Sequence, residues 1–394
     1  MTAARRINDV LVALINAERR VDPYIRPTFD RLFRRRLANG VQRLIVARRT
    51  HDGALLGEET LRPDEAEITA AIVEVMSAFT HRTYDHALPA QRAGNTKTYG
   101  VVRADLEVSP GLPASLRHGL FAAPRRFRAW VRFAGPGPLA PPDLEDNGIL
   151  SIGVKVMGVP GPKLLADEHW TQDLTGISAP TFTTPTVAEN VKLQRRIGDG
   201  TPILYFLHPS DSHLLDGLMQ GLYAKTQTNP LYEQYWSCSS YRLGDRQAIR
   251  YSIRPRLVVR TRMPRHPSDD YLREAMVATL ADTAVDFDVL VQRQTDPRRM
   301  PIEDDGVEWP ESLSPFVPVA TLHIPAQRFD SHRQLAFAGN LSYNPWHSLE
   351  AHRPLGSQNR ARRTIYLQLS ELRQRMSGTP HVEPTGEESF DADE

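Results

Sequence analysis

The spacing of apolar residues divides the chain into a helical first part and a β-rich body. In the first 90 residues, apolar residues recur every three or four positions, which is the period of a helix with one buried face. We expect helices over residues 5–20 and 29–49, with a break at Asn39-Gly40, and a third helix that begins at Asp64. This part is predicted to form an extension outside the main domain.

From about Gly100 the period changes to two, as in strands that bury one face. Clusters of Pro and Gly separate the runs, which read VVRADLEV, FRAWVRFAG, LSIGVKVMG, RYSIRPRLVVRTRM and DFDVLVQRQT. Many antiparallel strands imply a barrel or a sandwich. Helical patterns interrupt them at 208–227 and 268–283, and a last helix is predicted over 359–376.

The composition of the chain indicates where its domains begin and end. The 394 residues are 40% apolar and 24% charged, as in ordinary globular proteins. No stretch approaches the roughly 18 uninterrupted apolar residues of a membrane-spanning helix. We expect an Arg-rich helical extension over 1–90, one large domain over 91–378 and a disordered acidic tail over 379–394.

The net charge and the cysteine content exclude some classes of protein. A net charge of +1 provides no overall field that would attract nucleic acid. The run of arginines over 31–49, beside Phe33 and Leu37, has two interpretations: a helix that touches anionic lipid, or a docked helix with a solvated face. The single Cys238 excludes internal disulfides and fits a buried thiol, and no apolar leader follows Met1, so we expect a cytoplasmic protein.

The densest motif lies near the C-terminus, where Ser342-Tyr343 is followed by His347 and by HRPLG at 352–356. It resembles the R-x-F-S-Y-x-x-x-H and H-R-L-G patterns of haem catalases, above all their compact catalase-related branch, which includes peroxidases and allene oxide synthases. The resemblance covers roughly residues 90 to 365. It implies an α+β fold in which an antiparallel β-barrel of about eight strands is surrounded by helices.

The resemblance also implies a haem b site. Tyr343 takes the position of the ligand to the haem iron, with His347 behind it, and three arginines take the positions that hold the propionates: Arg92, Arg132 and Arg353. Catalases place an arginine one helical turn before the tyrosine, where this chain has Gly339.

On the other face of the expected haem, the chain departs from the catalase pattern. Asn95 stands in place of the distal histidine, Ile177 in place of a distal amide, and Ala134 in place of a supporting serine. Asn cannot exchange a proton near neutral pH, so hydrogen peroxide turnover should be poor. Either Asn95, Thr96 and Ile177 shape a dry pocket for an organic hydroperoxide, or the pocket is vestigial and Tyr343 is a packing residue.

Two functions follow from these residues. The first is a haem-dependent oxidoreductase, peroxidase or hydroperoxide isomerase-lyase that acts on a small peroxide or a fatty-acid hydroperoxide. The second is a non-enzymatic protein of the same fold that binds a lipid, a membrane surface or a protein partner through its basic helices. We expect no nucleic-acid partner. A homo-oligomer is compatible with the sequence, which does not define the oligomeric state.

Other clusters of polar residues are interpreted as structural. His347 and His352, with Glu350 between them, do not share one helical face, so they do not suggest a metal site. Asp304 and Asp305, in a Gly-containing segment, are interpreted as turn and cap residues.

Overall fold

The structure of the protein, a computed structural model, describes residues 2–49, 55–85, 89–208, 210–259 and 261–390. Within these residues, eight antiparallel strands close into a barrel in the order β7-β5-β4-β3-β2-β1-β9-β8, since β8 pairs back onto β7. The predicted barrel is therefore confirmed. Its strands are β1 (Thr98–Val108), β2 (Arg126–Ala134), β3 (Ser151–Val156), β4 (Gln172–Ile177), β5 (Tyr235–Trp236), β7 (Ala248–Pro255), β8 (Val285–Arg293) and β9 (Val317–Ile324); β6 (Ser240–Arg242) and β10 (Pro354–Leu355) extend the sheet beyond β7.

The core fills the inside of this barrel. Along β2, the buried side chains of Phe127, Val131 and Phe133 belong to the large interior cluster, as the alternation of a strand requires. Trp130 belongs to a different cluster, with residues of the helix that follows β9. The side chain of Arg132 also lies outside the interior cluster, so the outer face of β2 carries a buried charged residue.

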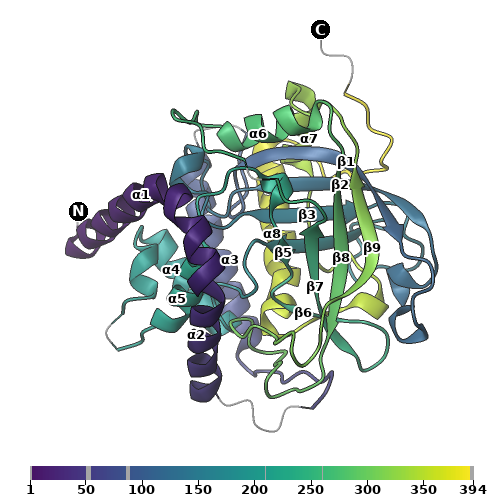
Figure 1. The fold of residues 1–394 in the computed structure, drawn as a ribbon, viewed down its shortest axis with the longest axis horizontal. Helices are drawn as coiled ribbons and strands as arrows, with labels where there is room; N and C mark the ends of the chain where they lie inside the picture. Colours follow the sequence, from purple (N-terminus) through teal and green to yellow (C-terminus); the bar gives the residue numbers. More distant parts are fainter. Residues whose placement is uncertain (1, 50–54, 86–88, 209, 260, 391–394) are drawn as a thin grey trace.

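Helices cover the outside of the barrel (Figure 1). Figure 1 shows α1, α2, α4 and α5 together on one side, with α8 passing behind the strands. The predicted helices that begin at Asp64 and span 359–376 are confirmed. The helices are α1 (Ala3–Phe29), α2 (Arg35–Arg48), α3 (Glu65–Tyr84), α4 (Val187–Gly198), α5 (Leu214–Tyr223), α6 (Tyr271–Leu280), α7 (His332–Asn340) and α8 (Ser357–Ser377). No helix within the described ranges is long and apolar enough to cross a membrane.

The N-terminal extension is more continuous than its sequence suggests. A π-helical segment, Asp30–Arg34, joins α1 directly to α2, and Asn39-Gly40 lies inside α2. The predicted break is wrong because Ala38 and Ile45 are held in a buried cluster with α5, which keeps the intervening turns helical.

The acidic tail is ordered as far as residue 390. The Glu383 carboxylate accepts hydrogen bonds from the main-chain N–H groups of His169 (2.8 Å) and Trp170. Trp130 Nε1 donates to Glu388 Oε2 at 2.9 Å, and the Phe390 ring lies 5.9 Å from the Trp130 ring. The disordered tail expected from composition therefore does not describe 379–390, because its carboxylates and one aromatic ring find partners on the barrel. Residues 391–394 lie outside the described residues.

Candidate functional site

A cavity of about 600 Å³ lies between the outer face of the barrel and the helices around it. This volume is in the usual range for small-molecule and cofactor sites. Strands β2, β3 and β4 form one wall, and α3, α4 and α8 form the opposite one. Five of the residues predicted for the site line it: Arg92, Asn95, Arg132, Ile177 and Tyr343.

Tyr343 occupies this cavity because a glycine makes room for its ring. Gly153 lies opposite Arg132 in the β2–β3 pair, and a Cβ atom there would lie 2.8 Å from Cδ1 of Tyr343. The Tyr343 hydroxyl is buried and has no hydrogen-bond partner among the described residues. Burial raises the pKa of Tyr343, although Lys155 and Arg132 act in the opposite direction. The phenol is therefore neutral and lacks the partner that a buried hydroxyl requires.

Three arginines, Arg92, Arg132 and Arg373, meet near Tyr343 and line the cavity. Their guanidinium groups donate to neutral oxygens, which belong to the carbonyls of Asn95, Thr96, Ala338, Gly339, Asn340 and Leu341 and the hydroxyls of Thr98 and Ser342. Among the described residues, no carboxylate forms an ion pair with any of the three. Burial lowers the pKa of Arg92 to about 10. Burial and repulsion from Arg92 together lower the pKa values of Arg132 and Arg373.

A fourth arginine, Arg362 on α8, also lines the cavity without a carboxylate partner within the described ranges. Its Nε donates to the Tyr366 hydroxyl at 3.1 Å, and its Nη2 donates to Thr175 Oγ1 at 3.3 Å. We call Arg92, Arg132, Arg362 and Arg373 the cavity arginines. Buried charges are normally paired, so four unpaired guanidinium groups around one cavity indicate that its ligand is an anion.

Asn95 and Ile177 form part of a face without a histidine. Asn95 has a left-handed backbone with φ 48°, which Asn adopts more readily than most residues, and its N–H donates to the Pro136 carbonyl at 3.3 Å. Ile177 ends β4 and pairs with Trp236 of β5. Thr96 was expected to line the pocket beside Asn95 and Ile177, but it does not. Its side chain is buried away from the cavity and donates a hydrogen bond to the Arg92 carbonyl at 2.7 Å.

Other walls of the cavity are mostly apolar. Asp146 is the one acidic residue among those that line it, and its Oδ2 accepts a hydrogen bond from Gly137 N–H at 2.9 Å. Burial raises the pKa of Asp146, while Gly137 N–H and Arg19 lower it in part. The apolar lining residues are Ile72, Met76, Ile149, Ile152, Ile177, Phe182, Leu193, Ile197, Ile203, Phe206, Ile365 and Leu369.

His347 lies beneath the cavity in a cluster of buried charges. Lys155 Nζ is 2.8 Å from Asp173 Oδ1 and also bonds Glu168, and all three side chains are fully buried. His347 Nδ1 is 2.8 Å from Asp173 Oδ2, and its Nε2 is 3.1 Å from Asp167 Oδ2. We call these five residues the Lys155 cluster. Its His and carboxylate atoms could suggest a metal site, but the Lys155 ammonium already supplies the cation.

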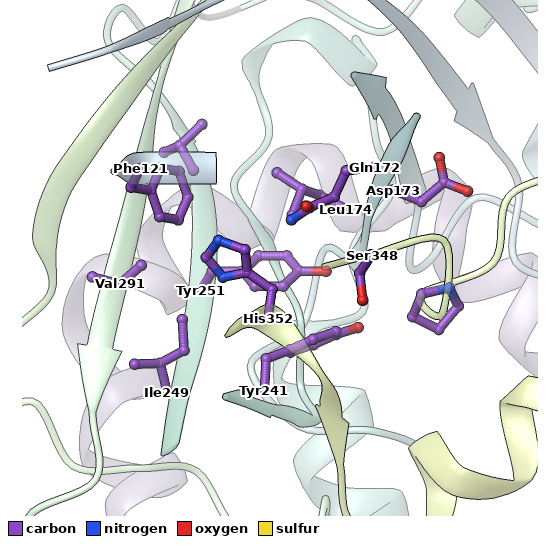
Figure 2. Close-up of a pocket in the computed structure, with 12 residues that line it drawn as sticks. Phe121, Gln172, Asp173, Leu174, Tyr241, Ile249, Tyr251, Val291, Ser348 and His352 are labelled. Atoms are coloured by element: carbon purple, nitrogen blue, oxygen red, sulfur yellow. The ribbon is translucent and has the colours of Figure 1, made fainter. Parts of the chain in front are cut away.

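The two histidines of the C-terminal motif lie in different environments. His352 lines a separate hollow of about 20 Å³, which is room for about one water, beside Tyr241 and Tyr251 (Figure 2). Its Nε2 accepts a hydrogen bond from Leu120 N–H at 2.8 Å, and burial lowers its pKa to about 4. His347 and His352 therefore lie in separate environments.

Arg353 does not reach the cavity. Its guanidinium pairs with Glu59, which also bonds Gly356 N–H at 2.9 Å and Arg360. The HRPLG turn is therefore tied to the segment before α3. Arg373 of α8, 20 residues further along the chain, lines the cavity instead.

Sequence analysis missed Arg362 and Arg373, although a signal was present. Arg362, Tyr366, Leu369 and Arg373 recur at four-, three- and four-residue spacing, which places them on one face of the predicted last helix. It also missed Arg19 of α1, which lines the cavity and donates to the Leu144 carbonyl at 3.3 Å.

Comparisons with known proteins point to one fold. No family model matches the chain, and the search of curated proteins finds no match. Among solved structures, it is similar to a fungal catalase (TM-score 0.59, 13% identity), to catalase A from Saccharomyces cerevisiae (0.61, 12%) and to a bacterial catalase (0.55, 14%). Each match covers 79% of this chain, and this chain spans 65%, 67% and 65% of those proteins. The chain therefore has the catalase fold.

Proposed function

We propose that the protein binds haem in the cavity, through Tyr343 on the iron, and acts on an organic hydroperoxide. One observation carries the proposal. A single cavity is lined by a buried phenol with no hydrogen-bond partner and by four guanidinium groups with no carboxylate at ion-pair distance, among the residues that the structure describes. Haem iron can bind a tyrosine oxygen and haem carries two carboxylates, so a bound haem would satisfy both groups.

The cavity arginines nearest Tyr343 fit the acidic groups of haem. A guanidinium presents two parallel N–H donors to a carboxylate, and Arg92, Arg132 and Arg373 could each do so from the same end of the cavity. Arg373 would take the role that the motif alone gave to Arg353. Two carboxylates would neutralise most of the charge that now repels within this group.

Tyr343 would hold the iron from the side of the Lys155 cluster. Lys155 Nζ lies 5.5 Å from the centre of the Tyr343 ring, where its positive charge favours the ionised phenol. Burial outweighs this effect in the protein alone, so deprotonation of the ligand would depend on the metal. Lys155 thus supplies part of the stabilisation that an arginine at position 339 would give.

A bound haem would supply the iron chemistry that breaks the O–O bond of a peroxide. The residues of this chain determine which peroxide enters. The apolar walls exclude water and favour an alkyl chain. Asn95 can donate a hydrogen bond but cannot take up a proton, which disfavours the dismutation of hydrogen peroxide. Asp146 is the acidic residue among those that line the cavity, and its carboxyl group can hold a proton.

The alternative function inferred from the sequence is a non-enzymatic protein that binds a lipid, a membrane or a partner through its basic helices. It explains fewer of the structural features. It accounts for the surface of α1 and α2. It leaves the cavity arginines and the Tyr343 hydroxyl without a ligand.

Turnover by the haemin-loaded protein tests the activity. We expect slow release of dioxygen from hydrogen peroxide and faster reduction or rearrangement of an alkyl hydroperoxide such as cumene hydroperoxide. Asn95→His should raise hydrogen peroxide turnover by roughly 100-fold, because a general base contributes at least that factor. Asn39→His, on the exposed face of α2, is the matched control. Brisk dioxygen release by the unmodified protein would contradict the proposal.

A further inference from the structure

The first helix has its polar and apolar faces reversed. Its buried side chains are Asn8, Asp22 and Arg26. Asn8 Oδ1 accepts from Ile203 N–H at 3.1 Å, and Asp22 Oδ2 accepts from Thr226 N–H at 2.6 Å. A helix on a globular protein normally buries its apolar stripe and exposes polar residues. In α1 the polar side chains contact the rest of the protein, so the apolar side chains face solvent.

The exposed apolar residues form a stripe along α1 that continues into α2. Positions 7, 10, 14 and 21 are separated by three, four and seven residues, so they lie on one face of the helix. The exposed fractions are 55% for Ile7, 61% for Val10, 62% for Leu14, 51% for Val21, 80% for Tyr24, 60% for Ile25, 48% for Leu32, 52% for Phe33, 48% for Leu37 and 51% for Leu44. Ten large apolar side chains that face solvent along one helical segment indicate a binding surface.

Arginines accompany this stripe. The exposed basic residues of α1, the π-helical segment and α2 are Arg5, Arg6, Arg20, Arg31, Arg35, Arg36, Arg43 and Arg48. The exposed acidic residues of the same segment, residues 2–49, are Asp9 and Glu18. A second copy of this surface would bring the same positive charge against itself. Anionic lipid headgroups complement the charge, and the acyl region accepts the apolar side chains.

Helix α1 also forms part of the cavity wall. Arg19, on the same helix, lines the cavity, and so does Ile203, whose N–H bonds Asn8. Figure 1 shows α1 and α2 on the outer side of the protein, with α4 and α5 beside them. A membrane bound by α1 and α2 would therefore lie next to one wall of the cavity.

We propose that α1, the π-helical segment and α2 form a docking surface for an anionic lipid membrane. The apolar stripe enters the boundary between headgroups and acyl chains, and the arginines contact phosphate and carboxylate groups. The docking itself does not require haem. Combined with the proposed function, it identifies the substrate class as hydroperoxides of membrane lipids or their fatty acids.

Co-sedimentation of the full chain with vesicles tests the docking. We expect binding to phosphatidylcholine vesicles that contain phosphatidylserine, little binding to phosphatidylcholine alone, and weaker binding as salt is raised. Arg35→Gln with Arg36→Gln should weaken binding by roughly 25-fold, because each basic residue near the surface is worth about fivefold. Arg125→Gln with Arg126→Gln, an exposed pair on the barrel, is the matched control.

The apolar contribution is tested by Tyr24→Ser with Ile25→Ser, matched by Leu257→Ser with Val258→Ser, which are 65% and 66% exposed. The first pair should abolish vesicle binding and the second should leave it unchanged; circular dichroism checks that each variant is folded. Failure to bind anionic vesicles at low salt would overturn the proposal. So would a dimer in light scattering that Tyr24→Ser with Ile25→Ser dissociates, since a second copy would then cover the stripe. Each assay is run with and without haemin, so vesicle binding without a haem spectrum would reject the haem site alone.

Discussion

Two groups of buried charges lie near Tyr343, and they differ in whether each charge has an opposite charge beside it. In the Lys155 cluster every charge meets an opposite one: Lys155 and His347 face Glu168, Asp173 and Asp167. Around the cavity, the hydrogen bonds that the guanidinium groups make to other described residues all go to neutral oxygens. The Lys155 cluster is therefore complete in the folded chain, whereas the cavity arginines require an anion from outside.

This contrast separates a structural role from a binding role. Breaking a balanced cluster leaves a buried charge unpaired, which costs stability. Removing one arginine from an unbalanced group relieves repulsion, so its main cost should be lost ligand affinity. The two groups should thus respond to substitution in opposite ways.

The largest effect is expected for Lys155→Met. This change would leave His347 as the one cation of the cluster beside the buried carboxylates of Glu168 and Asp173. Removing one partner of a buried pair costs about 3–5 kcal/mol. Urea unfolding of the haem-free protein measures it. Lys192→Met, which removes a surface pair with Glu189 and Asp211, is the control and should cost less than about 1 kcal/mol. Equal losses in the two variants would refute the distinction.

A smaller loss of stability and a clear loss of binding are expected for Arg373→Gln. A hydrogen bond from the Arg373 guanidinium to a haem carboxylate would be worth about 1.5–3 kcal/mol. The affinity of Arg373→Gln for haemin should therefore fall roughly 10- to 100-fold. The dimethyl ester of haemin, which lacks both carboxylates, should bind the original protein and Arg373→Gln about equally. Arg375→Gln, an exposed neighbour on α8, should behave like the original protein in the same titration. An unchanged affinity in Arg373→Gln would remove that residue from the site.

The smallest effect concerns pH. Burial and Lys155 oppose the charge on His347, but its bonds with Asp167 and Asp173 prevail and raise its pKa to about 9. Since this pKa is above the ordinary value of about 6.5, the stabilisation is fully present below pH 6.5 and is lost as pH rises through about 9. His347→Gln should reduce the fall in stability between these values. Parallel pH profiles of the two proteins in urea would contradict this assignment.

Much of the fold was predictable from the sequence because the barrel strands are long enough to show a period of two. The strands β5, β6 and β10 have two or three residues each and are defined only by pairing across the barrel. The predicted strand over 250–263 ends at Pro255. The order of residues 379–390 also depends on distant partners, such as Trp130 for Glu388.

The site was predictable in part for a similar reason. Arg92, Arg132 and Tyr343 lie in motifs where neighbouring residues fix the position, and the structure brings them to one cavity. Arg353 also lies in a motif, but Glu59, almost 300 residues away, holds it elsewhere. Arg373 reaches the site only because α8 packs across the barrel. Long-range packing of this kind has no local pattern.

The central claim is that the cavity is a haem site with Tyr343 on the iron. An absorption spectrum of the protein reconstituted with haemin tests it most directly. We predict a Soret band that falls sharply in Tyr343→Phe and persists in Tyr366→Phe, a second tyrosine of the same cavity. A protein that stays colourless after reconstitution, or a Tyr343→Phe variant with an undiminished Soret band, would contradict the account.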